Sequence, residues 1–414
     1  MVRATHKIEK IELSLNPQIR NGSKACQSKN IPIMAIENFI AYNPVRLHFG
    51  KGVVDGLGEV VKSYSNKVLL VYGKKSVKKY GYYDEVVKQL NSAGIDWVEY
   101  GGIKANPVIE DVRKAVNFGI ENSVTAVVAL GGGSVIDSSK IIAAAIASKI
   151  EPWDIVSWKS HPGSSLPLIC VLTLAATGTE MNAAAVVQNE KTKEKLGYVN
   201  PVLFPKESFL DPQYTVTVPT DYTTYGIVDL IAHALEAFYG EGEPSITDNI
   251  TLAIIKDAME HAPKLLSDLT NYDLRANIML DATLALNGLT SYGKKGGDWG
   301  VHAIGHELSL LFDTAHGATL SIAYPAWLKL QKDRIPNRII TMGKGLFNVT
   351  TVDESIHKLE EFFVSINSPV RLQNIEVENK TQEIIDQLDR NSASGMHHKL
   401  SESDHKMLVE LMTK

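Results

Sequence analysis

Five side chains that can bind a metal form two clusters in the second half of the chain. Asp229 and His233 are four residues apart, as are His302 and His306, and His316 follows across a probable turn. Spacing of four puts two side chains on one helix face, where they suit two ligands of one ion. One such pair alone is more often structural. Because every buried imidazole needs its own partner, five metal-capable side chains in two apolar segments favour a mononuclear metal site. The spacing leaves open which four bind.

A second motif, AVVALGGGSVIDSSK, places three glycines between a buried strand and a helix. Because glycine has no Cβ, a ligand can approach the backbone at Gly131–Gly133, and the helix opened by Ser134 presents free N–H groups. The motif predicts a pyrophosphate site, with a simple tight turn as the alternative. A hydroxyl-rich loop, TLAATGTEMN at 173–182, follows another strand and is expected to border the same crevice.

The elements that must position these motifs follow from hydrophobic periodicity. Strands are predicted at 67–73, 95–100, 125–130 and 166–174, and helices at 76–93, 108–121 and after GGGS. This alternation predicts a parallel sheet with helices on both faces. Beyond Asp211-Pro212 helical patterns take over, at 222–239, 249–268, 273–291, 299–312, 352–366 and 403–413. We therefore expect a Rossmann-like α/β domain at 37–211 and an all-helical metal-binding domain at 212–414.

Composition excludes several classes of protein. The 414 residues are 44% apolar and 21% charged with a net charge of −5, so nothing would gather nucleic acid. The longest apolar runs fall short of the roughly 18 residues of a membrane helix. With only Cys26 and Cys170, a disulfide framework is not expected, which indicates a reducing, cytoplasmic location. Residues 1–36 lack aromatic residues and carry excess positive charge, so we expect a disordered leader or a targeting segment.

With these motifs in order, the chain resembles the iron-containing (group III) alcohol dehydrogenases, and within them the NADPH-dependent butanol dehydrogenase and aldehyde reductase branch. The resemblance runs from about residue 38 to the C-terminus. It is carried, in family order, by GGIKANP, GGGSVIDSSK, TLAATGTEMN, GIVDLIAHALEAF and GGDWGVHAIGHELSLLFDTAHG.

The resemblance implies a role for each motif. It places metal ligands at Asp229, His233, His302 and His316, with Fe²⁺ or Zn²⁺ as the ion. It places His306 near the substrate as the candidate proton relay. The cofactor positions that it implies are Gly73, Lys74, Ser76, Asn106, Gly132, Gly133, Ser134, Asp137, Thr173, Thr177, Asn182 and Lys195.

The implied activity is hydride transfer between NADP(H) and a primary alcohol or aldehyde of butanol-like size, with the metal as Lewis acid. NADPH is expected over NADH because Gly73 stands where NAD-using relatives carry Asp. The only expected partners are the small substrate and a second copy of the chain, as a homodimer. Two alternatives remain, a metal-dependent lyase or hydrolase on the same scaffold and a non-catalytic nucleotide sensor. The lyase or hydrolase would have no use for the GGGS motif, and the sensor would not need the metal residues.

Overall fold

Six parallel strands form the central sheet of the computed structural model, which describes residues 36–414. Their order is β1-β8-β5-β4-β2-β3, and all five pairings are parallel. A separate antiparallel hairpin is made by β6 and β7. The bounds are β1 Arg46–Phe49, β2 Lys67–Tyr72, β3 Asp96–Tyr100, β4 Ala126–Gly131, β5 Leu168–Leu172, β6 Ala184–Asn189, β7 Glu194–Val199 and β8 Glu207–Leu210.

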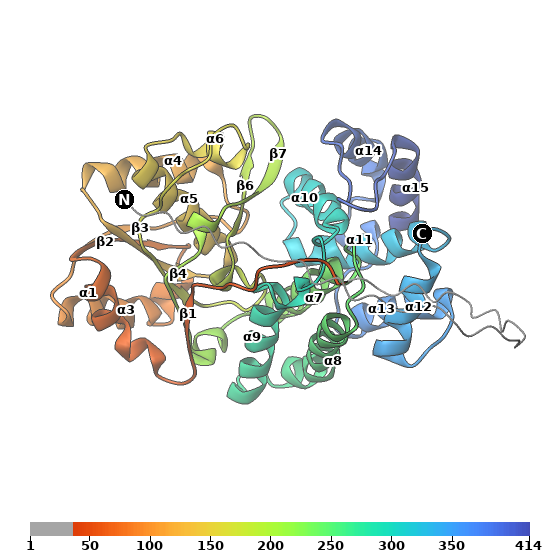
Figure 1. Cartoon of the computed structure of the whole chain (residues 1–414), viewed down its shortest axis with the longest axis horizontal. Coiled ribbons are helices and arrows are strands. Elements are labelled where there is room, and N and C mark those ends of the chain that lie inside the picture. The colour runs from red at the N-terminus through yellow and green to blue at the C-terminus, as the bar shows by residue number, and fades with distance from the viewer. Residues whose placement is uncertain (1–35) are drawn as a thin grey trace, which may run out of the picture. The chain divides into compact units, whose positions relative to one another are not determined.

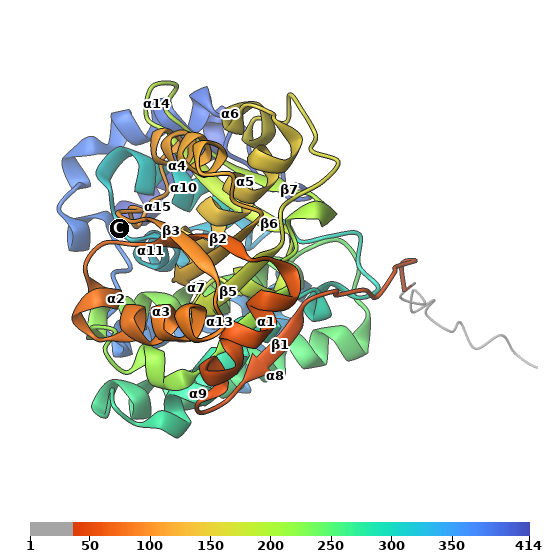
Figure 2. The same cartoon turned by 90° about the vertical axis from the view of Figure 1, so that its left-hand side faces the viewer.

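Both faces of this sheet are covered by helices. Successive side chains of a strand point to opposite faces, and because both sets are apolar here, each face must be buried. Leu69 and Val71 pack in the core beneath α4 (Ile109–Glu121), α5 (Gly133–Ser148) and α6 (Pro152–Val156). Val68 and Leu70 pack on the opposite side with α1 (Leu57–Tyr64) and α3 (Tyr82–Ser92). Figure 2 shows these two sets of helices on either side of the strands. The predicted α/β architecture is confirmed.

The sheet reverses its order of construction between β2 and β4. From β2 the chain adds β3 on one side, and then β4 on the other. β2 leads into Gly73 and β4 leads into Gly132. The cofactor residues predicted after β2 and those predicted in the glycine loop after β4 therefore both lie at this switch point. Crevices at the carboxyl ends of strands flanking a switch point are the usual ligand sites of open α/β sheets.

The helix predicted at 76–93 is wrong in one respect, since the structure divides it. α2 (Ser76–Lys79) ends before Gly81, and α3 begins at Tyr82. Gly81 has a φ of +83°, a left-handed conformation that terminates a helix and that glycine adopts without strain. Strands β1, β6, β7 and β8 were not predicted. For β1 and β8 the reason is their length, because a run of four residues is too short to show a clear pattern.

The chain beyond β8 is helical, as predicted, and Figure 1 shows these helices following one another from green to blue. Three of them, α11, α12 and α14, were not predicted. The bounds are α7 Thr220–Phe238, α8 Ser245–Ser267, α9 Tyr272–Leu286, α10 Gly300–Phe312, α11 His316–Gln331, α12 Pro336–Phe347, α13 Val352–Ser365, α14 Thr381–Arg390 and α15 Glu402–Thr413.

Residues Ala35–Lys414 form one compact unit, so the division at 211/212 into two domains stays a prediction. The last strand ends at Leu210 and the first long helix begins at Thr220. The leader predicted at 1–36 lies outside the described residues, apart from Ile36. Within residues 36–414, no helix is long and apolar enough to cross a membrane.

Candidate active site

Three helices bring the predicted metal residues together. Asp229 and His233 lie one turn apart on α7, His302 lies in the first turn of α10, and His316 is the first residue of α11. The same Asp229 oxygen, Oδ1, lies 3.5 Å from His233 Nδ1, 3.7 Å from His302 Nε2 and 3.9 Å from His316 Nε2. Ligand atoms about 2.1 Å from one tetrahedral ion are roughly 3.4 Å apart. Asp229, His233 and His302 have ligand atoms that all lie within 4.8 Å of one another, and His316 is joined to this group by its distance to Asp229.

These side chains are buried without the hydrogen bonds that burial normally demands. Asp229, His233 and His302 are each at most 6% exposed. Asp229 Oδ1, His233 Nδ1, His302 Nε2 and His316 Nδ1 have no hydrogen-bond partner among the described residues. An unpaired buried polar atom costs about 1–3 kcal/mol, so the three that face one another, on Asp229, His233 and His302, call for a common partner. The unpaired atom of His316 is Nδ1, whereas its Nε2 is the atom that faces Asp229. A cation fits this donor set of one carboxylate and three imidazoles.

The charges at this cluster are unequal. Burial lowers the pKa of His233 to about 4, and burial also holds the pKa values of His306 and His316 well below the usual histidine range. Burial opposes the charge on His302 as well, but the nearby carboxylates of Asp229 and Glu236 outweigh that effect and raise its pKa to about 9. Neutral imidazoles keep a lone pair, which is the form that binds a metal.

Glu236 is a functional candidate that the sequence analysis missed. Its Oε1 accepts hydrogen bonds from the backbone N–H of His302 and from His302 Nδ1, both at 2.9 Å. This leaves Nε2 of His302 facing Asp229. Glu236 is three residues after His233 and seven after Asp229, so the same helical face of α7 carries all three, and that spacing was the available signal.

His306 stands beside the cluster, not within it. Its ring centroid lies 4.9 Å from that of His316 and 6.4 Å from that of His302. Asp229 Oδ1, by contrast, is approached by the other three histidines of α7, α10 and α11. The structure thus brings Asp229, His233 and His302 together, with His316 next to Asp229, and places His306 beside His316; which four side chains bind an ion stays a prediction.

The glycine loop after β4 is held by close contacts. A Cβ on Gly133 would lie 2.6 Å from Thr177 Cγ2, and a Cβ on Gly132 would lie 3.1 Å from Leu174 Cβ. The threonine loop, which follows β5, thus packs directly on the glycine loop after β4. These two loops form one surface. Gly132 caps α5 without any side-chain hydrogen bond at that end, and the first backbone N–H groups of this helix are free to bind an anion.

The other predicted cofactor residues fall into two groups. Gly73, Lys74 and Ser76 follow β2 and are exposed or partly exposed, as are Thr173 and Thr177. Asp137 and Asn182, in contrast, have their polar atoms engaged inside the protein. Ser134 is partly exposed, and its hydroxyl donates to the carbonyl of Ala105.

A polar bridge links the β6–β7 hairpin, through the loop before α4, to the turn after α10. Buried Lys195 on β7 donates to Asn106 Oδ1 at 3.0 Å, and Asn106 Nδ2 donates to Asp313 Oδ1 at 2.9 Å. Asp313 follows α10 with a φ of 49°, a conformation that Asp tolerates better than most residues. Burial lowers the pKa of Lys195 to about 8. Two predicted cofactor residues therefore lie in contact, within reach of the turn that leads to His316.

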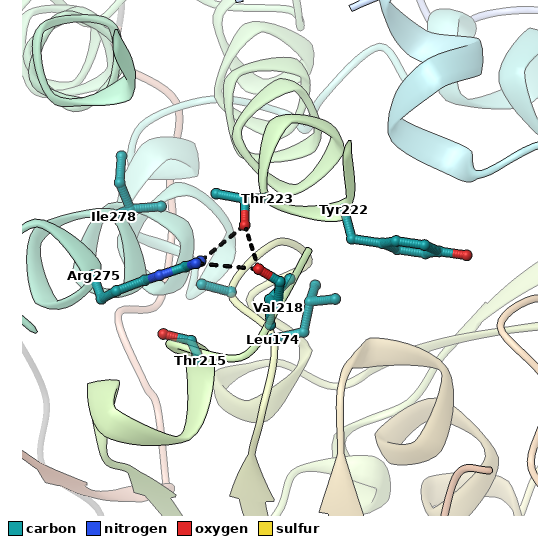
Figure 3. A pocket seen from close by; sticks show the side chains of 8 residues that line it. Leu174, Thr215, Val218, Tyr222, Thr223, Arg275 and Ile278 are labelled. Atoms are coloured by element: carbon teal, nitrogen blue, oxygen red, sulfur yellow. Dashed lines mark hydrogen bonds between the residues drawn. The ribbon is translucent and has the colours of Figure 1, made fainter. Parts of the chain in front are cut away.

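A pocket adjoins the glycine loop at the carboxyl end of β5. Figure 3 shows the Arg275 guanidinium pointing toward Thr223 and Val218; it donates to Thr223 Oγ1 at 2.9 Å and to the Val218 carbonyl at 3.2 Å. Leu174 belongs to this pocket and to the contact with Gly132. The residues around the pocket are Leu174, Ala175, Thr215, Val218, Tyr222, Thr223, Arg275 and Ile278.

Two family models match this chain. The model for iron-containing alcohol dehydrogenase matches residues 44–212, and the model for the C-terminal part of the Fe-containing alcohol dehydrogenase family matches residues 223–412. This chain belongs to the iron-containing alcohol dehydrogenase family. The resemblance stated from the sequence motifs is thereby confirmed.

Individual relatives of this iron-containing alcohol dehydrogenase carry different cofactors in their names. A probable NADH-dependent butanol dehydrogenase 1 of Bacillus subtilis is 39% identical over 379 residues, which cover 89% of this chain and 98% of that protein. The NADPH-dependent aldehyde reductase YqhD of Escherichia coli is 36% identical over 349 residues, covering 82% and 89%. The crystal structure of NADH-dependent butanol dehydrogenase A from Thermotoga maritima superposes with a TM-score of 0.89 at 36% identity, covering 92% and 100%.

Proposed function

We propose that this iron-containing alcohol dehydrogenase transfers hydride between NADP(H) and a primary alcohol or aldehyde of about the size of butanol. One observation carries the proposal: Asp229 Oδ1 lies within 3.9 Å of three imidazoles, of which His233 and His302 are buried and His316 is partly buried. The glycine loop and the packed threonine loop supply a separate place for a dinucleotide. Relatives named butanol dehydrogenase and aldehyde reductase support the substrate class.

Asp229, His233, His302 and His316 would hold one divalent ion, Fe²⁺ or Zn²⁺, because a ring nitrogen of each histidine lies within 3.9 Å of Asp229 Oδ1. When bound, the ion supplies Lewis acidity toward the substrate oxygen, and the nicotinamide supplies or accepts the hydride. Glu236 orients His302 by accepting from its Nδ1. His306, which lies next to His316, relays the proton of the alcohol substrate's hydroxyl group. Lys195 and Asn106 together bind the nicotinamide half of the cofactor.

The remaining parts of the proposal concern partners and location. Ile40 and Tyr42 are 92% and 71% exposed in the segment before β1, and β1 is an edge strand of the sheet. Exposed apolar side chains beside an unpaired strand edge support a homodimer. Cys170 is buried and free, which fits a reducing cytoplasm. The small alcohol or aldehyde remains the only other partner.

Glu236→Gln is expected to weaken metal binding roughly ten- to a hundredfold. The amide keeps the size of the side chain but removes the negative charge that polarises the His302 ring. Metal affinity measured by competition with a chelator of known strength tests this expectation. Glu260→Gln is the matched control, because Glu260 is exposed on α8 and, within residues 36–414, pairs with Lys264 alone. Equal metal affinity in both variants would contradict the role assigned to Glu236.

The decisive test of function is turnover by the purified, metal-loaded protein. Incubation with NADPH and butyraldehyde should consume both in equal amounts, followed by the near-ultraviolet absorbance of NADPH and by butanol formation. Loss of the aldehyde without NADPH oxidation would favour a lyase or hydrolase. Binding of NADPH without turnover, with any aldehyde of this size range, would favour the nucleotide sensor. Asp229→Asn is the negative control, since it keeps the shape of the side chain but removes its charge.

A further inference from the structure

A lysine lies fully buried behind the proposed cofactor crevice. Lys140 on α5 is 0% exposed, in a stretch of the helix that is otherwise rich in alanine and isoleucine. A buried ammonium is costly unless its hydrogen bonds are satisfied. Burial accordingly lowers the pKa of Lys140 to about 8, while nearby Asp137 acts in the opposite direction. The hydrogen bonds that satisfy this buried ammonium therefore point to its role.

Among the described residues, the acceptors of this ammonium lie on one short stretch of chain, from the end of the threonine loop to the first residue of β6. Lys140 Nζ donates to Thr179 Oγ1 at 2.7 Å and to the Ala184 carbonyl at 2.7 Å. The Asn182 carbonyl and Asn182 Oδ1 lie at 2.9 Å and 3.0 Å. The loop is therefore gathered around one point on α5, the helix that begins at the glycine loop.

Asp137, one turn earlier on the same helix, completes the arrangement. Its Oδ1 accepts from Thr179 Oγ1 at 2.6 Å, and its Oδ2 accepts from the Val186 N–H at 2.9 Å. The Thr179 hydroxyl thus accepts from Lys140 and donates to Asp137. We call Lys140, Thr179 and Asp137 the loop clamp.

The loop clamp connects to the crevice through Thr177. The Thr179 N–H donates to Thr177 Oγ1 at 3.3 Å, and the Thr177 side chain packs against Gly133 so closely that a Cβ there would lie 2.6 Å away. Gly178, between the two threonines, has a φ of +58°. The position of Thr177 over the glycine loop thus depends on how Thr179 is held.

We propose that Lys140 is a positioning residue for the dinucleotide: through Thr179 and Asp137 it sets the threonine loop at the distance from the glycine loop that the pyrophosphate requires. The inference rests on the proposed dinucleotide crevice and extends it. It also gives Asp137 and Asn182 a different task from direct cofactor contact. The Asn182 amide is used within the loop, since Oδ1 accepts from the Ala184 N–H and Nδ2 donates to the Gly178 carbonyl.

Thr179→Val tests the inference, because valine keeps the shape of threonine and removes only the hydroxyl that joins Lys140 to Asp137. We expect the Kd for NADPH to rise roughly ten- to a hundredfold, the effect of losing hydrogen bonds to charged groups. The KM for butyraldehyde and the metal content should stay unchanged, which a general loss of structure would not allow. Thr179→Ser restores the hydroxyl and should restore most of the affinity.

Two further variants complete the experiment. Lys140→Met should weaken NADPH binding at least as much as Thr179→Val. Thr341→Val is the matched control, because Thr341 is exposed and donates only to the Asn337 carbonyl of its own helix. If unmodified protein binds neither NADPH nor NADH, the proposed function fails and this inference with it. If unmodified protein binds NADPH and Thr179→Val binds it equally well, the inference alone is overturned.

Discussion

His316→Ala should lose the divalent ion and lower kcat/KM by roughly a thousandfold, whereas His306→Ala should keep the ion. A bound metal supplies several kcal/mol of transition-state stabilisation, and each 1.4 kcal/mol is a factor of about ten in rate. His316 Nε2 lies 3.9 Å from Asp229 Oδ1, on the side where His233 and His302 also approach. His306 lies beside His316 without joining that approach.

Metal analysis after gel filtration and steady-state kinetics measure both parts of this prediction. His306→Ala is expected to lower turnover because the proton relay is lost, while its metal content stays near that of the unmodified protein. His357→Ala is the control for a histidine change as such, since His357 is exposed on α13 and has Glu361 as its one ionic partner in the described part of the chain. The assignment would be reversed if His306→Ala lost the ion and His316→Ala retained it.

The second large effect concerns the choice of cofactor. We expect kcat/KM to favour NADPH over NADH by at least about tenfold, because one charge-assisted contact to the 2′-phosphate contributes about 1.5–3 kcal/mol. Lys74 and Lys75 are exposed at the tip of β2. Lys78 is occupied by Glu99 at 3.1 Å and lies 4.2 Å from the Tyr83 ring centroid. Lys79 contacts Tyr80. Among residues 36–414, Lys74 and Lys75 make no ion pair, so they can meet a phosphate.

Gly73→Asp should erase or reverse this preference. An acidic side chain at the tip of β2 accepts hydrogen bonds from the ribose 2′-hydroxyl and repels a 2′-phosphate. The site has room for the change, because a Cβ on Gly73 would lie 3.6 Å from Val135 Cγ2 and 3.7 Å from the Ile103 carbonyl, which is ordinary contact.

Kinetics with both cofactors across three variants decide the point. Lys74→Gln with Lys75→Gln should lower the NADPH preference, and Lys88→Gln, a change of an exposed lysine on α3, should not. NADH serving the unmodified protein as well as NADPH would refute the argument and align this chain with the relatives named as NADH-dependent.

The sequence alone determined the classes of element and their order. Apolar runs such as KVLLVYG bury both faces of a central parallel strand, and a side chain every three or four residues marks a helix face. These are local patterns, so β2, β4 and α7 fall within a few residues of their predicted bounds. The four-residue spacing likewise placed Asp229 and His233 on one face of a helix. The sequence also marked the three glycines, whose missing Cβ atoms permit a close approach.

Only the tertiary structure decided which distant residues meet. The spacing in the sequence could not choose among five metal-capable side chains, because the packing of α7 against α11, rather than any periodicity, puts His316 near Asp229. The clamp around Lys140 was equally invisible, since its acceptors lie about forty residues further along the chain. Side-chain hydrogen bonds across such separations depend on how helices and strands pack, and a pattern within one element carries no information about them.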